Sequence, residues 1–97
     1  MYVVLLTYEK PWAEVMRLAP EHRAYAATRY ADGTYLMSGR KPDRSGGVIL
    51  AQAPDRDTLD QILHKDPFWR EGIARFEVVE FLPQMAAERF QDLIVQV

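Results

Sequence analysis

Hydrophobic runs separated by turn signals predict four strands along the chain. Residues 2–8 are apolar, aromatic or β-branched almost without interruption, which is typical of a strand buried on both faces. Residues 34–38, 47–52 and 73–82 show further short runs bounded by glycine or proline, and each predicts another strand. Two stretches of helical periodicity separate these runs, so the predicted order of elements is βαββαβ.

The first helix is expected to run from Pro20 to Ala31. Residues 12–19 are interpreted as a connector or a short helical turn. Proline is well suited to the first helical position, because its missing N–H has no partner there. One stripe of this helix carries His22 and Tyr25, so His22 is expected to face the core from the first turn.

The second helix is expected to begin after Asp55, whose carboxylate is a plausible N-cap. Its apolar stripe extends toward Asp66, and Pro67 is expected to end the helix by forcing the preceding residue out of helical geometry. The stripe consists of Leu59, Ile62 and Leu63.

The element order predicts an α+β fold of the ferredoxin-like class, with both helices on one face of a four-stranded antiparallel sheet. The first and third strands are apolar on both sides. Open apolar faces of this extent are rare on monomers, so the other sheet face is expected to pack against a second subunit. The predicted domain covers residues 1–82, and residues 83–97 are interpreted as a C-terminal extension that forms a short helix or an interface segment.

Composition narrows the classes of function. The 97 residues fit one domain, and 12 basic against 14 acidic residues leave a net charge of −2, which disfavours nucleic acid as a partner. Cysteine is absent and there are 2 histidines, so thiol nucleophiles, disulfides and the common metal centres are not expected. No secretory signal or long apolar run is present, which favours a cytoplasmic protein without a membrane partner.

His22 and Asp66 are the first candidates for catalysis. Each lies on the inward side of its helix, and the two helices lie side by side in the predicted fold. The positive end of the first helix is expected to keep the imidazole of His22 neutral, as a general base requires, while Asp66 orients the ring. The alternative is a structural histidine beside an Asp-Pro that ends a helix.

The segment from Ser38 to Gly47 is the second candidate site. It is predicted to be a loop whose glycines and three cations attract an anion such as a carboxylate or a phenolate. The substrate-binding residues expected from it are Ser38, Gly39, Arg40 and Gly47. The alternative is a solvated hairpin turn, and a role for Ser38 as a nucleophile is only weakly indicated.

Aromatic residues could line an apolar pocket for a ring-shaped ligand, although in a domain of this size they more often belong to the core and to an interface. His64 lies off the apolar stripe of its helix and is expected to face solvent. The aromatic candidates are Tyr8, Tyr25, Tyr35, Phe68 and Trp69.

Four segments together carry a resemblance to a known family. They are His22-Arg23-Ala24-Tyr25, Leu36-Met37-Ser38-Gly39, Gly46-Gly47-Val48-Ile49-Leu50 and the stretch from Asp66 to Ile73. From Met1 to about Phe81 the chain resembles the YCII-related (YciI-like) family. The resemblance implies a ferredoxin-like fold that dimerises as an α/β barrel, with a His-Asp dyad carried here by His22 and Asp66. That family includes a member that eliminates chloride from a hydroxyquinone-type ring, and its fold is similar to that of muconolactone isomerases.

The leading hypothesis is therefore a cofactor-independent enzyme of the lyase, dehydrohalogenase or isomerase type. Its expected substrate is a small cyclic or aromatic oxygenated molecule, from which neutral His22 takes a proton while Ser38, Gly39 and Arg40 hold an oxyanion. A non-catalytic module that binds or senses a small molecule is the alternative hypothesis. A third, an assembly partner of another protein, predicts an exposed apolar patch beyond the dimer surface.

Overall fold

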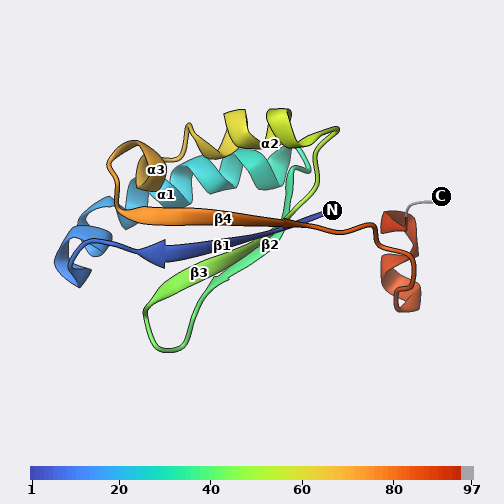
Figure 1. Ribbon diagram of the computed structural model, residues 1–97, viewed down its shortest axis with the longest axis horizontal. Coiled ribbons are helices and arrows are strands. Elements are labelled where there is room, and N and C mark those ends of the chain that lie inside the picture. The colour runs from blue at the N-terminus through green and yellow to red at the C-terminus, as the bar shows by residue number, and fades with distance from the viewer. Residues whose placement is uncertain (95–97) are drawn as a thin grey trace.

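The computed structural model describes residues 1–94, and its elements follow the predicted order (Figure 1). All strand pairs are antiparallel, and the strands lie side by side in the order β2-β3-β1-β4. This is the ferredoxin-like α+β arrangement, so the predicted fold class is confirmed. The strands are β1 (Tyr2–Tyr8), β2 (Tyr35–Arg40), β3 (Gly46–Ala51) and β4 (Ala74–Glu80), and the helices are α1 (Trp12–Ala31), α2 (Arg56–Leu63), α3 (Pro67–Arg70) and the 3₁₀ helix η1 (Glu88–Leu93).

The helices α1, α2 and α3 cover one face of the sheet (Figure 1). In β1, Tyr2, Val4 and Leu6 are buried against them, whereas Val3 and Leu5 between these positions are only partly buried. The continuous apolar run of β1 therefore places apolar side chains on both faces of the sheet, because successive side chains of a strand point to opposite sides.

Helix α1 is longer than predicted and corrects the sequence interpretation. It begins at Trp12, contains 20 residues and carries Pro20 in its interior. Proline there removes the N–H that would bind the carbonyl of Met16. The turns before Pro20 nevertheless stay helical, and they bury Val15 and Leu18 in the core. Within residues 1–94, neither α1 nor any other helix is long and apolar enough to cross a membrane.

The predicted loop between β2 and β3 is shorter than expected. Gly39 and Arg40 belong to β2, Gly46 and Gly47 belong to β3, and the connection spans only residues 41–45. Pairing between the two strands extends to their ends, since the N–H of Lys41 donates to the carbonyl of Gly46 over 2.8 Å. The glycines therefore lie in sheet backbone and not in a flexible loop.

A β-bulge in β2 decides which of its side chains face the helices. Tyr35 pairs with Ala51, but Met37, two residues further on, pairs with the adjacent Leu50. The extra residue changes the alternation of the strand, because directly paired residues share a face of the sheet. As a result Ser38, paired with buried Ile49, lies on the helix side.

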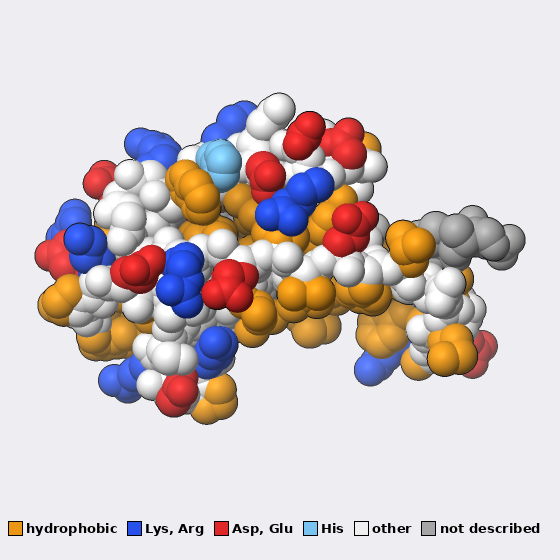
Figure 2. All heavy atoms as spheres, in the orientation of Figure 1, with side chains coloured by type: hydrophobic (Ala, Val, Ile, Leu, Met, Phe, Trp, Pro, Cys, Tyr) orange, Lys and Arg blue, Asp and Glu red, His pale blue; other side chains and the backbone are white. Residues whose placement is uncertain are grey.

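The opposite sheet face carries an apolar row that crosses all four strands. Val3 pairs with Leu50 on one side and with Val79 on the other, and Leu50 pairs with Met37. Met37 is 61% exposed and Val79 is 52% exposed. Figure 2 shows hydrophobic side chains gathered on the side of the sheet away from the helices and again on the C-terminal segment.

The chain after β4 leaves the body of the domain (Figure 1). The N–H of Phe81 still donates to the carbonyl of Met1 over 2.9 Å, and the chain then runs to η1, which has no buried residue. Met85 in this segment is 92% exposed. The extension contains the 3₁₀ helix η1, and its role as a short helix or an interface segment stays a prediction. Residues 95–97 of the predicted extension lie outside the described residues.

Candidate functional site

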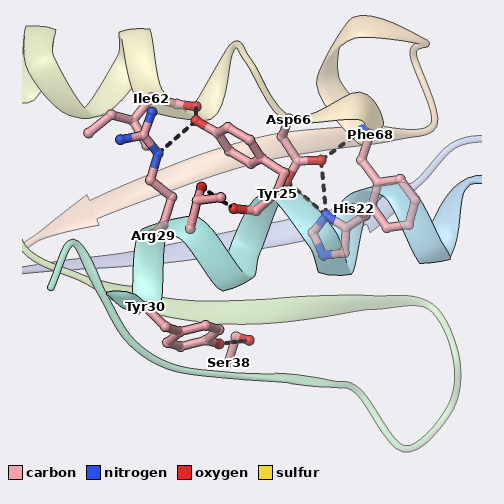
Figure 3. Close-up of polar contacts among 9 residues, drawn as sticks. His22, Tyr25, Arg29, Tyr30, Ser38, Ile62, Asp66 and Phe68 are labelled. Carbon is pink, nitrogen blue, oxygen red and sulfur yellow. Dashed lines mark hydrogen bonds and ion pairs between the residues drawn. The ribbon is translucent and has the colours of Figure 1, made fainter. Parts of the chain in front are cut away.

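The imidazole of His22 meets the carboxylate of Asp66 (Figure 3). His22 Nδ1 lies 2.9 Å from Oδ1 and 2.8 Å from Oδ2 of Asp66. Asp66 is completely buried, while the side chain of His22 is 20% exposed. The two residues are 44 positions apart in the chain, and the fold brings them together as the sequence analysis expected.

Asp66 is held in place by the short helix that follows it. Its Oδ1 accepts a hydrogen bond from the backbone N–H of Phe68 over 2.8 Å, so the carboxylate is the N-cap of α3. Its backbone carbonyl accepts from the N–H groups of Trp69 and Arg70. Pro67 at the first helical position fits this turn, because that position needs no N–H donor. The sequence analysis missed α3 and read Pro67 only as the end of the preceding helix.

Phe68 packs against the face of the His22 imidazole. The rings of His22 and Phe68 are stacked, with centroids 4.2 Å apart and planes 3° apart. Phe68 is buried, so its position is fixed by the core. One contact at the ring edge and one at the ring face therefore restrict the imidazole to a single orientation.

The geometry assigns a tautomer to His22. A carboxylate only accepts hydrogen bonds, so Nδ1 facing Asp66 carries the proton and Nε2 has a free lone pair. Figure 3 shows this second nitrogen turned away from Asp66. The expected influence of a helix N-terminus is wrong, because His22 lies in the middle of α1, ten residues after its start at Trp12. Asp66, and not the helix dipole, selects the form of the imidazole with a basic Nε2.

A cavity of about 250 Å³ lies beside His22, between the first half of α1 and the sheet. The predicted substrate-binding residues Ser38, Gly39, Arg40 and Gly47 all line it together with His22. Asp66 does not line the cavity and acts on it only through His22. The arrangement therefore brings the predicted residues together around one space.

The hydroxyl of Ser38 on β2 is paired with the hydroxyl of Tyr30, which lies on α1 eight residues after His22 (Figure 3). Either oxygen can donate in this pair. When Tyr30 donates, the proton of Ser38 is free for a ligand in the cavity. Because the partner of Ser38 is Tyr30 and not His22, the geometry favours a hydrogen-bond donor over a nucleophile.

Two of the aromatic candidates line the cavity, and the others lie elsewhere. Tyr8 and Phe68 line the cavity, and burial raises the pKa of the Tyr8 hydroxyl although Arg40 acts in the opposite direction. Tyr35 lies in the core, where burial raises the pKa of its hydroxyl. Trp69 is absent from the cavity lining and stacks on the exposed His64, with centroids 4.1 Å apart.

Tyr25 ties α1 to the chain segment that carries Asp66. Its hydroxyl donates to the carbonyl of Ile62 over 2.5 Å and accepts from Nε of Arg29 over 3.0 Å (Figure 3). Burial raises the pKa of this hydroxyl, so it stays protonated and keeps donating. The contact joins α1 to the end of α2, four residues before Asp66.

The sequence analysis missed Trp12 and Arg23, which also line the cavity. Trp12 fell in the region read as a connector. A signal was present, because Trp12, Val15 and Ala19 continue the helical spacing of Ala26 through Pro20. Within residues 1–94 no group of three or more His, Asp or Glu side chains is placed to hold a metal ion.

Comparison with known proteins supports the fold. The family model described as the YCII-related domain matches residues 1–82. The structure of 5-chloro-2-hydroxyhydroquinone dehydrochlorinase from Burkholderia phenoliruptrix AC1100, in complex with 2,5-dihydroxybenzoquinone, is similar with a TM-score of 0.69 at 17% identity, over 86% of this chain and 95% of that one. Muconolactone isomerase is similar with a TM-score of 0.73 at 16% identity, over 90% of this chain and 93% of that one. A search of curated proteins finds no significant match.

Proposed function

The chain belongs to the YCII-related domain family, and from this premise we propose that it is an enzyme of the lyase or isomerase type that transfers a proton without a cofactor. One observation carries the proposal. A buried carboxylate holds Nδ1 of His22 at 2.8 Å, and the ring borders a cavity large enough for a small molecule. A fixed imidazole with a free Nε2 is suited to general acid–base catalysis.

The proposed reaction begins when Nε2 of His22 removes a proton from a carbon of the substrate. The C–H bond breaks, the N–H bond forms, and the electron pair moves into the substrate as an enolate-type oxyanion. An elimination then expels a leaving group with its electron pair, whereas an isomerisation returns the proton to a different carbon. The imidazolium formed in between lies against the Asp66 carboxylate, which stabilises it at that moment.

The other side of the cavity supplies groups for the developing negative charge. Arg40 lines the cavity as a cation, and Ser38 lines it with a hydroxyl that can donate when Tyr30 donates to it. Gly39 and Gly47 add no side chain, so a ligand can approach the strand backbone closely. These residues are proposed to hold the oxyanion.

The two similar structures support this type of reaction. By their names, one is a dehydrochlorinase of a hydroxyhydroquinone and the other is an isomerase of a lactone. A small cyclic oxygenated substrate is accordingly proposed for this chain as well. That no cofactor is needed and that the protein acts in the cytoplasm stay predictions.

We also propose that two copies of the chain associate through the open sheet face. The apolar row of Met37, Leu50, Val3 and Val79 crosses the whole sheet, and an exposed apolar surface of this extent is best stabilised by a second copy of itself. The C-terminal segment follows β4, the strand that carries Val79, and exposes Phe81, Leu82 and Met85. It is proposed to extend the same interface.

Turnover by variants of the dyad tests the proposed function. His22→Ala and Asp66→Asn are expected to lower the rate of conversion of a substrate by about 100-fold or more while the fold is retained. A rate that stays unchanged in both variants would contradict the mechanism. A ligand that is bound at the cavity and released chemically unchanged by the unaltered protein would favour a binding module instead.

A further inference from the structure

The cavity beside His22 combines positive charge with apolar walls. Arg23 and Arg40 line it together with the imidazole, and no carboxylate is among its lining residues. The walls are formed mainly by Leu6, Val15, Met16, Ala19, Ile49 and Phe68. A ligand that matches this lining is apolar over most of its surface and carries negative charge at one edge.

Two guanidinium groups lie over the ring of Trp12, which lines this cavity. The Cζ atoms of Arg40 and Arg44 lie 5.5 Å and 5.0 Å from the centroid of its ring. An aromatic face holds an arginine in place without neutralising its charge, and a guanidinium is weakly hydrated. The two cations are therefore positioned and remain available to an anion.

Within residues 1–94 no carboxylate forms an ion pair with Arg23, Arg40 or Arg44. The arginines that do pair with carboxylates lie elsewhere on the surface, and they are Arg17, Arg29, Arg56 and Arg75. Two of these three unpaired arginines, Arg23 and Arg40, line the cavity and the third, Arg44, lies over Trp12 at its edge, which leaves an excess of positive charge at that place.

The connection between β2 and β3 holds Arg44 toward Trp12. Arg44 has a φ of 63°, and its N–H donates to the carbonyl of Lys41 over 3.0 Å. The carboxylate of Asp43 in the same connection accepts from the N–H and the hydroxyl of Ser45 over 3.0 Å and 2.6 Å. Asp43 thus binds within the connection and forms no ion pair with Arg40 or Arg44 among the described residues.

We propose that the cavity selects a ring compound that carries an oxyanion, either a carboxylate or a cyclic enolate, with this group against Arg40 and Arg44 near Trp12. A cavity of about 150 Å³ is enough for benzene. The 250 Å³ found here therefore accommodates a ring with such a substituent. The proposal rests on the proposed function only for placing the reacting edge of the ring toward His22.

Binding of matched probes to the full chain tests the proposal. Benzoate is compared with neutral benzamide, and the enolate of dimedone with its neutral enol methyl ether, by titration calorimetry at low salt. Each anion is expected to bind about tenfold or more tightly than its neutral counterpart, because hydrogen bonds to charged groups are the stronger ones. The comparison of the two anions shows whether the carboxylate or the enolate is preferred.

Variants that remove the charge of one arginine test which residues are responsible for the preference for anions. Arg40→Gln and Arg44→Gln are expected to reduce the affinity for the anions to about that of the neutral probes and to leave the neutral probes unchanged. Arg56→Gln, in which an arginine on α2 is replaced, serves as the matched control and is expected to change neither. The proposal would be overturned if charged and neutral probes bound equally tightly, or if the arginine variants lost the same affinity for both. It would also be overturned if neither anion bound at millimolar concentration. Because these are binding measurements, they can fail while the dyad mechanism stands, and the dyad mechanism can fail while they succeed.

Discussion

The imidazole of His22 lies flat on the phenyl ring of Phe68, with ring centroids 4.2 Å apart. Phe68 follows Asp66 by two residues, so one short turn supplies both contacts that fix the imidazole. The carboxylate of Asp66 binds the ring edge, and the phenyl ring covers the ring face. Pro67 between them starts α3 and thereby sets the angle at which both side chains reach His22.

Asp66→Asn is expected to lower turnover by about 100- to 10,000-fold, the contribution typical of a positioned base. The amide of asparagine can donate to Nδ1 of His22, which places the imidazole proton on Nε2 and removes the basic lone pair. His22→Ala is expected to have an effect of at least this size. Steady-state kinetics on a converted substrate measures both.

His64→Ala provides the matched control for the dyad. His64 is exposed and stacks on Trp69 away from the cavity, so its loss is expected to leave turnover unchanged. Equal losses of turnover in the His64 and His22 variants would point to an indirect effect.

Asp66→Ala is expected to destabilise the fold by about 1–3 kcal/mol, since it also leaves the N–H of Phe68 without its partner. Circular dichroism checks the fold of each variant.

Gly46→Ala is expected to lower the free energy of unfolding by about 3 kcal/mol. A Cβ atom at this position would lie 1.7 Å from the carbonyl oxygen of Leu6 in the neighbouring strand, so β1 and β3 would have to separate. At Gly39 a Cβ atom meets nothing within 4 Å, and Gly39→Ala is expected to be nearly neutral. Urea unfolding compares the pair, and similar stabilities of the two variants would contradict the strand contact.

Tyr25→Phe and Tyr35→Phe are expected to change stability in opposite directions. Tyr25→Phe removes the hydrogen bond to the carbonyl of Ile62 and is expected to cost about 1 kcal/mol. Within residues 1–94 the buried hydroxyl of Tyr35 has no hydrogen-bond partner, so Tyr35→Phe is expected to stabilise the fold by about the same amount. Thermal unfolding measures both, and a loss of stability in Tyr35→Phe would reveal a partner for that hydroxyl.

Asp55→Ala is expected to lower Tm at neutral pH by a few degrees. The N–H of Thr58 donates to the Asp55 carboxylate over 2.8 Å and holds the pKa of this carboxyl below its usual value. Stabilisation from a lowered pKa is complete above the pKa of the unfolded chain and is lost as pH falls through the pKa of the folded state. The difference in Tm between the protein and the variant should therefore shrink on acidification, which thermal scans at several pH values measure.

Asp55→Asn is the control for this pH dependence. Its amide oxygen still caps α2 but does not titrate, so most of the Tm is expected to be retained at neutral pH. A difference between protein and Asp55→Ala that stays constant across the acidic range would exclude the carboxylate as its source.

Val79→Lys is expected to prevent formation of the proposed dimer without unfolding the chain. Val79 is 52% exposed in one chain, so the monomer tolerates a charge there, whereas a packed sheet face does not. Met85→Lys tests the C-terminal segment in the same way at a residue that is 92% exposed. Sedimentation velocity gives the masses, and a monomeric unaltered protein would contradict the proposed association.

Strands and capped helices could be predicted from the sequence because their signals are local. The apolar run of β1 and the N-cap at Asp55 appear in the structure where they were expected. The contact between His22 and Asp66 was also predictable, because the order βαββαβ already brings their two helices together. Here the predicted topology was sufficient to bring together residues that are distant in the sequence.

Other features were not predicted, either because a stronger local signal concealed them or because they depend on tertiary packing. Proline usually begins a helix, so Pro20 concealed the first turns of α1, which burial of Val15 and Leu18 stabilises. Helix α3 has 4 residues, too few to show a period. The approach of Arg44 to Trp12 requires the connection between β2 and β3 to reach the start of α1, and this follows from the tertiary structure alone.

The bulge at Leu36 has a consequence for how proteins of this fold can diverge. The extra residue in β2 turns Ser38 toward the cavity side and Met37 toward the open sheet face. Deletion of Leu36 would remove the bulge but leave Met37 opposite Leu50 and Ser38 opposite Ile49, so both side chains would keep their faces. The faces would be exchanged only if the bulge closed without the loss of a residue, because Met37 would then pair with Ile49 and replace the polar cavity wall by an apolar one. A one-residue insertion in this edge strand can thus be absorbed in evolution without a change in the chemistry of the cavity.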